Sequence, residues 1–289
     1  MRVRPFAKRE RKNTMSKLYD AILGLAIGDA LGVPYEFEQR GSFICSDMVG
    51  YGTHNQPEGT WSDDTSMTLA TLDSLKNNNG IIVTEDICRR FNYWLLYGDY
   101  TVNGEVFDAG ITTCTALKKG RPAVGEWDNG NGSLMRILPL AFVDCTDDEI
   151  RAVSAITHGH WISEEACVIY VHVVNRLLAG EPIASIIPTL ENKKPFDRLK
   201  YINTLDISQI KSSGYVVDTL EAALWVVSHE GDWEKGFRND ILAAVNLGKD
   251  TDTVAAVAGG IAGIIYGLED VHDWVEKLRN KEEIIGCLW

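Results

Sequence analysis

Apolar residues recur every three or four positions along most of the chain, which is the spacing of one face of an α-helix. After Ser16, for example, Leu18, Ile22 and Leu25 keep this spacing until the turn at Pro34. No segment alternates apolar and polar residues over the roughly four to eight positions that a half-buried strand needs. The pattern therefore predicts an all-α protein.

The same periodicity and the capping signals locate the individual helices. A helix around 67–75 ends in the turn-rich run 77–80, and further helices are expected at 84–95, 164–178, 234–247, 251–266 and 271–280. The stretch 181–213 is the least regular part of the chain. The expected N-caps are Ser16, Asp108, Thr146 and Asp218, the last two in capping boxes with Glu149 and Glu221.

Glycines recur inside two of these helices, as Gly24, Gly28, Gly259, Gly260 and Gly263. A glycine in a helix interior costs about 1 kcal/mol against alanine. Repeated glycines are typical of helices whose backbones approach one another in a crowded core. We therefore expect close helix packing at these positions.

The first residues, MRVRPFAKRERKNTM, are basic and lack the apolar run of a signal peptide. We expect residues 1–15 to form a disordered basic arm, with Met15 as a candidate start, and residues 16–289 to form one domain. No low-complexity linker divides the chain after Met15. The apolar stretches at 21–33 and 254–266 are too short and too rich in glycine to span a bilayer.

Acidic residues outnumber basic ones in the 289-residue chain, and the formal net charge is -13. A surface of this sign repels the phosphates of nucleic acids and of anionic lipids, so neither is expected as a bulk partner. The six cysteines form no CxxC pair, which disfavours a zinc ribbon and favours reduced thiols in a cytoplasmic protein. A monomer is the expected state.

Two segments far apart in the sequence place paired acids at the start of a predicted helix. The first segment carries Ser62, Asp63 and Asp64, and the second carries Asp250, Asp252 and Thr253. Helix capping explains either segment taken alone. Their repetition favours a metal site, because two carboxylate pairs brought together repel one another unless cations neutralise them. Ligands that are all oxygen select hard ions such as Mg²⁺, Mn²⁺ or Ca²⁺.

A third acid, Glu36, lies just beyond the first predicted helix, between Tyr35 and Phe37. A glutamate flanked by two aromatic residues is unusual in a solvated loop. Removal of water from its carboxylate would raise the pKa and suit Glu36 to proton transfer. The alternative is an edge residue whose carboxylate points into water, and the segment alone leaves both interpretations open.

Four motifs contain these acids and their surroundings: ILGLAIGDALGVPYEF, GTWSDDTSMTLATLDSL, GNGSLMRILPLAF and NLGKDTDTVAAVAGGIAGIIYG. In these motifs and in their order, the chain resembles the ADP-ribosylglycohydrolase superfamily, and most closely its bacterial dinitrogenase reductase-activating glycohydrolase branch. The resemblance runs from about residue 17 to about residue 268, which is nearly all of the chain.

The resemblance implies a single-domain orthogonal helical bundle with a binuclear metal cleft, in which two divalent cations, Mg²⁺ or Mn²⁺, are bound. The implied metal ligands are Ser62, Asp63, Asp64, Asp250, Asp252 and Thr253. The implied catalytic residues are Glu36, Asp63 and Asp64. The implied substrate-binding residues are Asp108, Asn131, Gly132, Ser133, His158 and Tyr215, the last of which would contact the adenosine or a ribose.

Several basic and small residues refine this picture. Family members often have glycine or another small residue where Lys249 stands, and a lysine there would donate to a phosphate or partly neutralise the acids. The amides of residues 130–133 are expected at a helix start, where they would hold a diphosphate that the glycines allow to approach closely. Arg136 would either reinforce this site or make a structural ion pair.

The implied reaction is hydrolysis that removes ADP-ribose from a modified protein side chain, through a transition state with oxocarbenium character. Cations would make a water acidic enough to attack near neutral pH. Asp63 or Asp64 would orient this water, and Glu36 would exchange the proton. The GNGSLMR sequence favours ADP-ribosyl-arginine as the substrate.

Other hypotheses stay open from the sequence. The acceptor could instead be serine, a free ADP-ribosyl derivative or a nucleic-acid end. The chain could be an all-α diphosphohydrolase or a terpenoid-type diphosphate lyase, although Asp63 and Asp64 lack the final acid of a DDxxD motif. It could also be a module that binds ADP-ribose without cleaving it, which the intact Glu36 and the complete ligand set disfavour.

Overall fold

The structure, a computed structural model, describes residues 8–190, 193–231 and 233–289. Within these residues it contains helices and no β-sheet, only isolated bridges such as that between Gly130 and Tyr215, so the predicted all-α class is confirmed. The α-helices are α1 (Lys8–Gly32), α2 (Asp63–Asn77), α3 (Thr84–Tyr97), α4 (Ile111–Lys119), α5 (Asp147–Ser154), α6 (Trp161–Leu178), α7 (Ile183–Ile186), α8 (Val216–Ser228), α9 (Phe237–Asn246), α10 (Thr251–Tyr266), α11 (His272–Lys277) and α12 (Lys281–Cys287).

The helix starts agree with the sequence in some places and differ in others. Thr146 and Glu149 form the expected capping box of α5, with the Thr146 hydroxyl accepting from the Glu149 amide over 3.3 Å. The first helix begins upstream of its expected cap, so Ser16 lies inside α1. Of the expected basic arm, residues 1–7 lie outside the described part of the chain.

Besides Ser16, two further expected caps are wrong. Gly110, not Asp108, precedes α4, and Tyr215, not Asp218, precedes α8. Asp218 instead lies in the first turn of α8 and accepts from the Ser213 hydroxyl over 2.6 Å. The physical reason is that the backbone turn at 213–215 already orients the chain, so α8 starts three residues earlier than the capping pattern indicates.

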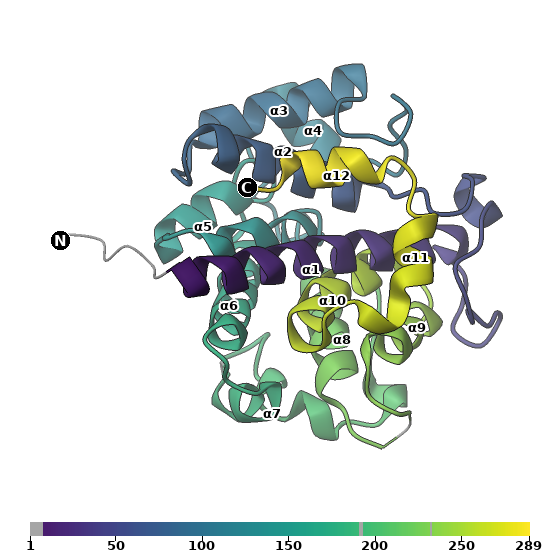
Figure 1. Cartoon of the computed structure of the whole chain (residues 1–289). Coiled ribbons are helices and arrows are strands. Elements are labelled where there is room, and N and C mark those ends of the chain that lie inside the picture. The colour runs from purple at the N-terminus through teal and green to yellow at the C-terminus, as the bar shows by residue number, and fades with distance from the viewer. Residues whose placement is uncertain (1–7, 191–192, 232) are drawn as a thin grey trace.

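The bundle is organised around its first helix (Figure 1). Helix α1 crosses the middle of the view, with α2, α3, α4 and α12 above it and α8, α9 and α10 below it. Its most extensive contact is with α10. Helices from the two ends of the sequence thus form the centre of the molecule, which brings together the two segments with paired acids.

Glycines make the contact between α1 and α10 possible. A Cβ atom added to Gly24 would lie 2.4 Å from the Gly259 carbonyl oxygen, and one added to Gly28 would lie 2.0 Å from that of Ala255. A Cβ added to Gly263 would lie 2.2 Å from the Asp20 carbonyl oxygen. Since real Cβ atoms do not approach backbone atoms this closely, only glycine fits. The expected close packing is confirmed.

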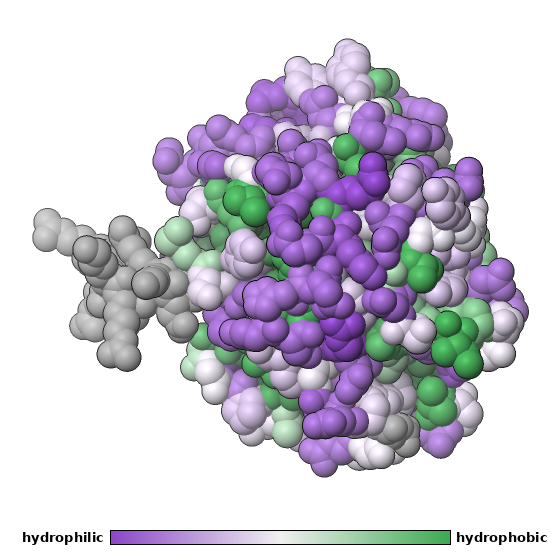
Figure 2. Space-filling view, turned by 45° about the vertical axis from the view of Figure 1, so that its right-hand side comes forward, coloured by the Kyte–Doolittle hydropathy of each residue, from purple (hydrophilic) through white to green (hydrophobic). Residues whose placement is uncertain are grey.

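One face of the molecule is predominantly polar. Figure 2 shows one face on which hydrophilic residues dominate and apolar residues occur in small, separate patches. Among the described residues, no helix is long and apolar enough to cross a membrane. The central helices α1 and α10 are instead buried by the helices around them.

Candidate active site

A cavity of about 380 Å³ lies where the ends of several elements meet. The start of α2, the start of α10, the turn after α1 and the loop before α4 all contribute to its wall. Residues that line it are Glu36, Phe37, Asp63, Asp108, Ala109, Gly110, Ile111, Thr112, Thr113, Gly130, Asn131, Gly132, Met135, His158, Gly214, Asp250 and Thr253. Many of the residues implied by the four motifs therefore converge here.

The start of α2 is held in place by an acid that sequence reasoning missed. Asp29 of α1 is fully buried and accepts hydrogen bonds from the Ser62 amide over 2.9 Å and from the Thr65 amide over 3.0 Å. The Thr65 hydroxyl also donates to Asp29 over 2.6 Å. Ser62 caps the helix, Asp63 lines the cavity, and Asp64 is fully buried and does not line it. The signal in the sequence was the acidic residue after Gly28 in the first motif, at a position inside an otherwise apolar helix.

The start of α10 reaches the same place because of its close packing on α1. A Cβ added to Gly32 would lie 2.3 Å from the Asp252 Cα atom. Lys249 has a φ of 67°, a conformation that favours glycine. Its amide donates to the Glu38 carbonyl and its carbonyl accepts from the Phe37 amide over 2.6 Å. Lys249 thereby joins the Glu36 turn to α10.

Direct contacts connect the two acidic segments. The Thr253 hydroxyl donates to Asp64 Oδ2 over 3.2 Å, and the Ser62 hydroxyl donates to the same oxygen over 3.3 Å. The Asn131 side-chain amide donates to Asp250 Oδ2 over 3.0 Å. The six implied metal ligands thus lie in one cluster, with Asp252 buried beneath the cavity.

Burial and the repulsion between neighbouring carboxylates raise the pKa values of the acids in this cluster. Burial raises the pKa of Asp63, Asp64 and Asp252 well above the usual aspartate value, and the charges of neighbouring carboxylates raise it further. Burial likewise raises the pKa of Asp250 to about 6 and that of Asp108 to about 10. A group of carboxylates in this state is unfavourable in the ionised form unless cations neutralise it.

Three buried carboxylate oxygens in the cluster show whether its residues fit a cation. Asp64 Oδ1, Asp250 Oδ1 and Asp252 Oδ2 are buried without a hydrogen-bond partner among the described residues. Buried polar atoms are almost always paired, so unpaired oxygens at one place indicate room for a ligand that accepts lone pairs. Ligand atoms of Asp29, Asp64 and Asp252 lie within 4.8 Å of one another. The residues therefore fit a cation.

A second group of possible ligands lies beside the first. Glu36, His54, Asp108 and Asp252 also bring one ligand atom each within 4.8 Å of one another, and Asp252 belongs to both groups. The carboxylate of Glu36 is 5% exposed and contacts His54 Nε2, so its side chain turns inward rather than into water. His54, which also lies 3.9 Å from Asp108 Oδ1, was not anticipated, since no motif contains it.

The implied substrate-binding residues divide into two sets. Asp108, Asn131, Gly132 and His158 line the cavity. Ser133 does not: its side chain is buried and its hydroxyl accepts from Ser154 over 2.9 Å. Tyr215 does not line the cavity either. It follows the lining residue Gly214 in the chain and is 36% exposed.

The two basic residues near the motifs do not reach the acids. Arg136 is fully buried and donates to the Gly132 and Val153 carbonyls and to the Thr157 hydroxyl, so it is neither a cavity residue nor part of an ion pair among the described residues. The Lys249 side chain lines a neighbouring cavity with Arg40, Lys211 and others. The loop from Gly130 leads into a short 3₁₀ helix, Leu134–Arg136, so the helix expected to start after this loop is a 3₁₀ turn and not an α-helix.

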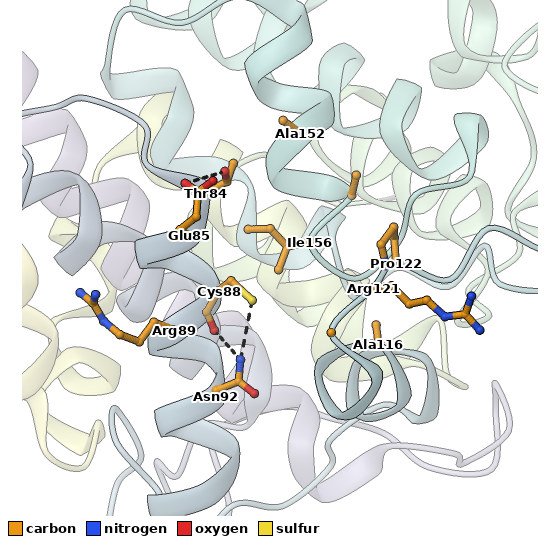
Figure 3. A pocket seen from close by; sticks show the side chains of 12 residues that line it. Thr84, Glu85, Cys88, Arg89, Asn92, Ala116, Arg121, Pro122, Ala152 and Ile156 are labelled. Carbon is orange, nitrogen blue, oxygen red and sulfur yellow. Dashed lines mark hydrogen bonds between the residues drawn. The ribbon is translucent and has the colours of Figure 1, made fainter.

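A larger cavity, of about 510 Å³, lies between α3, the end of α4 and the end of α5 (Figure 3). Cys88 and Ile156 point into the space between the helices, whereas Arg89 and Arg121 point away on opposite sides. Its lining contains one acid, Glu85, and no group of possible metal ligands. The paired acids therefore mark the smaller cavity as the candidate active site.

Comparison with known proteins agrees with this choice. Residues 10–288 match the family model for ADP-ribosylglycohydrolase. The ADP-ribosylarginine hydrolase Tri1 of Pseudomonas putida (strain GB-1) is 34% identical, over 94% of this chain and 77% of that protein. The ADP-ribosyl-(dinitrogen reductase) glycohydrolase of Rhodospirillum rubrum is 32% identical, over 91% of this chain and 90% of that protein. A solved structure titled ADP-ribosylglycohydrolase-related protein complex superposes with a TM-score of 0.78 at 29% identity, covering 96% of this chain and 97% of that one.

A match of this extent defines the class of protein as a hydrolytic enzyme that removes ADP-ribose. The chain belongs to the ADP-ribosylglycohydrolase family. The alternatives of a diphosphohydrolase and of a terpenoid-type lyase are thereby excluded, and so is a module without enzymatic activity.

Proposed function

We propose that this enzyme is a metal-dependent hydrolase that removes ADP-ribose from modified arginine side chains, with two divalent cations, Mg²⁺ or Mn²⁺, in the acidic cluster. The observation that carries the metal proposal is the set of unpaired buried oxygens on Asp64, Asp250 and Asp252. Ligand atoms of Asp64 and Asp252, one from each acidic segment, lie within 4.8 Å of one another, which supports a cation site between the two segments. The ligands would be Ser62, Asp63, Asp64, Asp250, Asp252 and Thr253.

The chemistry of the donors supports a hard cation. The cluster offers carboxylate and hydroxyl oxygens, which suit Mg²⁺ and Mn²⁺, and no cysteine lies within it. When bound, such cations stabilise negative charge on oxygen and lower the pKa of water. Proton transfer, the orientation of water and the binding of ADP-ribose are assigned to side chains and backbone groups of the enzyme.

Glu36 is the proposed proton-transfer residue, and Asp63 and Asp64 are the proposed groups that orient water. Glu36 lies at the cavity wall with its carboxylate turned inward, and His54 contacts the carboxylate and restricts its rotation. Asp63 also lines the cavity, whereas Asp64 does not line it and accepts hydrogen bonds from Ser62 and Thr253. This division favours Asp63 over Asp64 as the group that faces the reacting water.

Four further residues that line the cavity form the proposed ADP-ribose site. Asp108, Asn131, Gly132 and His158 offer acceptors, donors and an open backbone within one cavity. Ser133 is proposed to act through its backbone position in this loop, since its hydroxyl is engaged in the core. Tyr215 is proposed to contact the adenosine or a ribose from the rim, where its ring is partly exposed.

The relatives favour arginine as the acceptor. Two relatives at 33–34% identity carry the name ADP-ribosylarginine hydrolase. Hydrolysis of another ADP-ribosyl linkage, such as one to serine, is the second candidate. The ADP-ribosylhydrolase ARH3 of Bos taurus is 22% identical over 93% of this chain, and its name gives no acceptor. The higher identity makes arginine the better-supported choice.

The experiment is to incubate the enzyme with arginine-modified and serine-modified peptides and to measure released ADP-ribose. Each reaction is run with Mg²⁺, with Mn²⁺ and with a chelator. Release from the arginine peptide only, and only with metal, is the expected result. Equal release with chelator would refute the metal proposal, and faster release from the serine peptide would refute the choice of acceptor.

We further propose that the enzyme acts as a monomer in the cytoplasm, with residues 16–289 as one domain. Residues 8–15 of the expected arm continue α1 of this domain. All of its cysteines are free in the structure, which suits a reducing compartment. An ADP-ribosylated protein is the proposed partner, and ADP-ribose the proposed product.

A further inference from the structure

We propose that Arg136 and Thr157 are positioning residues that hold His158 in the tautomer with its proton on Nε2, so that His158 presents an N–H donor to the cavity. The identity of the ligand that accepts from this donor rests on the proposed function. The tautomer itself follows from hydrogen bonds within the chain.

The first part of this chain of contacts is a buried cation. Arg136 is fully buried, forms no ion pair with a described residue, and has its guanidinium carbon 4.4 Å from the centre of the Phe91 ring. It donates from Nε to the Gly132 carbonyl over 3.1 Å and from Nη2 to Thr157 Oγ1 over 2.8 Å. One guanidinium therefore holds both the glycine loop and Thr157.

The second part is the direction of the hydrogen bond between Thr157 and His158. Thr157 is fully buried, and its Oγ1 lies 2.8 Å from His158 Nδ1. An arginine can only donate, so Oγ1 accepts from Arg136 and its own proton remains to be satisfied. If His158 Nδ1 donated, this buried hydroxyl proton would have no partner. Thr157 therefore donates to a bare Nδ1, and the neutral ring carries its proton on Nε2.

The third part is the position of the ring. A Cβ added to Gly132 would lie 2.9 Å from His158 Cε1, and one added to either Gly130 or Gly132 would lie 3.4 Å from Nε2. Gly132 thus leaves room for the imidazole at the cavity wall, and Gly130 lies beside it. Nε2 forms no hydrogen bond with another described residue, so its donor is free for a ligand.

The charge state of the ring agrees with this geometry. Burial lowers the pKa of His158 to about 3, and the positive charge of Arg136 lowers it further. The imidazole is therefore neutral at physiological pH, and its single N–H proton lies on either Nδ1 or Nε2. A neutral Nε2–H donor suits an anionic oxygen of an ADP-ribosyl group in a cavity whose other side chains are mostly acceptors.

The first experiment measures the tautomer without any ligand. Nitrogen-15 spectra of the histidine-labelled full chain distinguish a protonated from a bare ring nitrogen, and His158→Gln identifies the His158 signals by their loss. The expected spectrum has a bare Nδ1 and a protonated Nε2. A protonated Nδ1 in the parent would overturn the proposal, whatever the ligand is.

The second experiment removes the hydroxyl. Thr157→Val, which keeps the side-chain shape, is expected to populate the other tautomer, whereas Thr157→Ser keeps the parental spectrum. Thr71→Val is the matched control, because Thr71 is a buried threonine whose hydroxyl bonds only to the Met67 carbonyl of its own helix. An unchanged tautomer in Thr157→Val would overturn the proposal. Should that variant not fold, the parent and Thr157→Ser spectra decide it.

The third experiment tests the donor with ADP-ribose as the probe, by calorimetry on the Mg²⁺-loaded enzyme. Thr157→Val is expected to bind roughly 10-fold more weakly, as loss of one hydrogen bond to an anionic group implies, with Thr157→Ser and Thr71→Val near the parent. The shift in melting temperature on addition of Mg²⁺ should be the same in all four proteins. Parental affinity in Thr157→Val would refute the donor role, whereas failure of the parent to bind ADP-ribose would refute the proposed function and leave the tautomer result standing.

Discussion

Thr253 and Asp64 are separated by 189 positions in the sequence, yet the Thr253 hydroxyl donates to Asp64 Oδ2 over 3.2 Å. The contact joins the first turn of α10 to the first turn of α2. It exists because α10 packs against α1 through glycines, while Asp29 of α1 holds the start of α2. The acidic cluster is therefore a product of how three helices pack, and its properties can be tested through that packing and through its individual acids.

The first prediction concerns Asp252, which belongs to both groups of possible ligands and has an unpaired buried oxygen. Asp252→Ala relieves carboxylate repulsion, so the metal-free variant should be no less stable than the parent. It should lose the stabilisation that bound metal supplies, about 2.7 kcal/mol at a metal concentration of 100 Kd. Thermal unfolding with and without Mg²⁺ or Mn²⁺ measures this. Asp148→Ala, which changes an exposed acid, is the control. An equal rise in melting temperature for Asp252→Ala and the parent would show that Asp252 is no ligand.

The second prediction separates Glu36 from the metal ligands. Glu36→Gln keeps the size of the side chain but cannot accept the proton, so turnover should fall by roughly 10²–10⁴-fold. Metal stabilisation and ADP-ribose affinity should remain close to those of the parent. Turnover at saturating metal is the measurement, and Glu38→Gln, an exposed glutamate two residues away, is the matched control. Activity restored by excess metal would instead identify Glu36 as a ligand.

The third prediction concerns the contact between α1 and α10. Gly28→Ala places a Cβ 2.0 Å from the Ala255 carbonyl oxygen, so the helices must separate, and the free energy of unfolding should fall by at least about 2 kcal/mol. Gly286→Ala is the control, because a Cβ there meets nothing within 4 Å. It should raise the free energy of unfolding by about 0.5–1 kcal/mol, since alanine favours helix. Urea unfolding measures both variants, and a loss of equal size in the two would contradict the role of the contact.

The fourth prediction is a pH dependence at Glu221. Burial raises the pKa of this carboxyl from 4.5 to about 7, although Arg198 lies 3.5 Å away. The folded state holds the proton more tightly than the unfolded state, so the contribution of Glu221 to stability is largest below pH 4.5. It is lost as the pH rises toward 7.

Glu221→Gln removes this titration. The stability of the parent relative to the variant should therefore decrease by about 3 kcal/mol between pH 4 and pH 8, which corresponds to the shift from 4.5 to about 7. Urea unfolding of both proteins at the two pH values measures the difference. Asp148→Asn, at an exposed position, should show no such change. A constant difference between parent and Glu221→Gln would show that Glu221 is ionised in the folded protein near its usual pKa.

Local patterns in the sequence were sufficient to predict the helical class and several elements. The 3.6-residue periodicity and the acids after Ser62 and Lys249 located α2 and α10, and the Thr146 capping box located α5, because these signals act within one or two helical turns. The glycines indicated close packing for the same reason, because the helix stability that each glycine costs can be recognised from its position within the helix. The four motifs likewise indicated the family that the whole chain matches.

The partners of these elements were decided only by the tertiary structure. Nothing in the local pattern showed that Asp29 would hold α2, that His54 would reach Glu36, or that the Ser133 hydroxyl would turn into the core. The capping pattern at Asp218 and Glu221 was even misleading, since Glu221 is buried rather than at a helix start. The physical reason is that a side chain's burial and hydrogen-bond partners depend on residues far away in sequence, which approach only once the glycine-lined backbones of α1 and α10 have packed together.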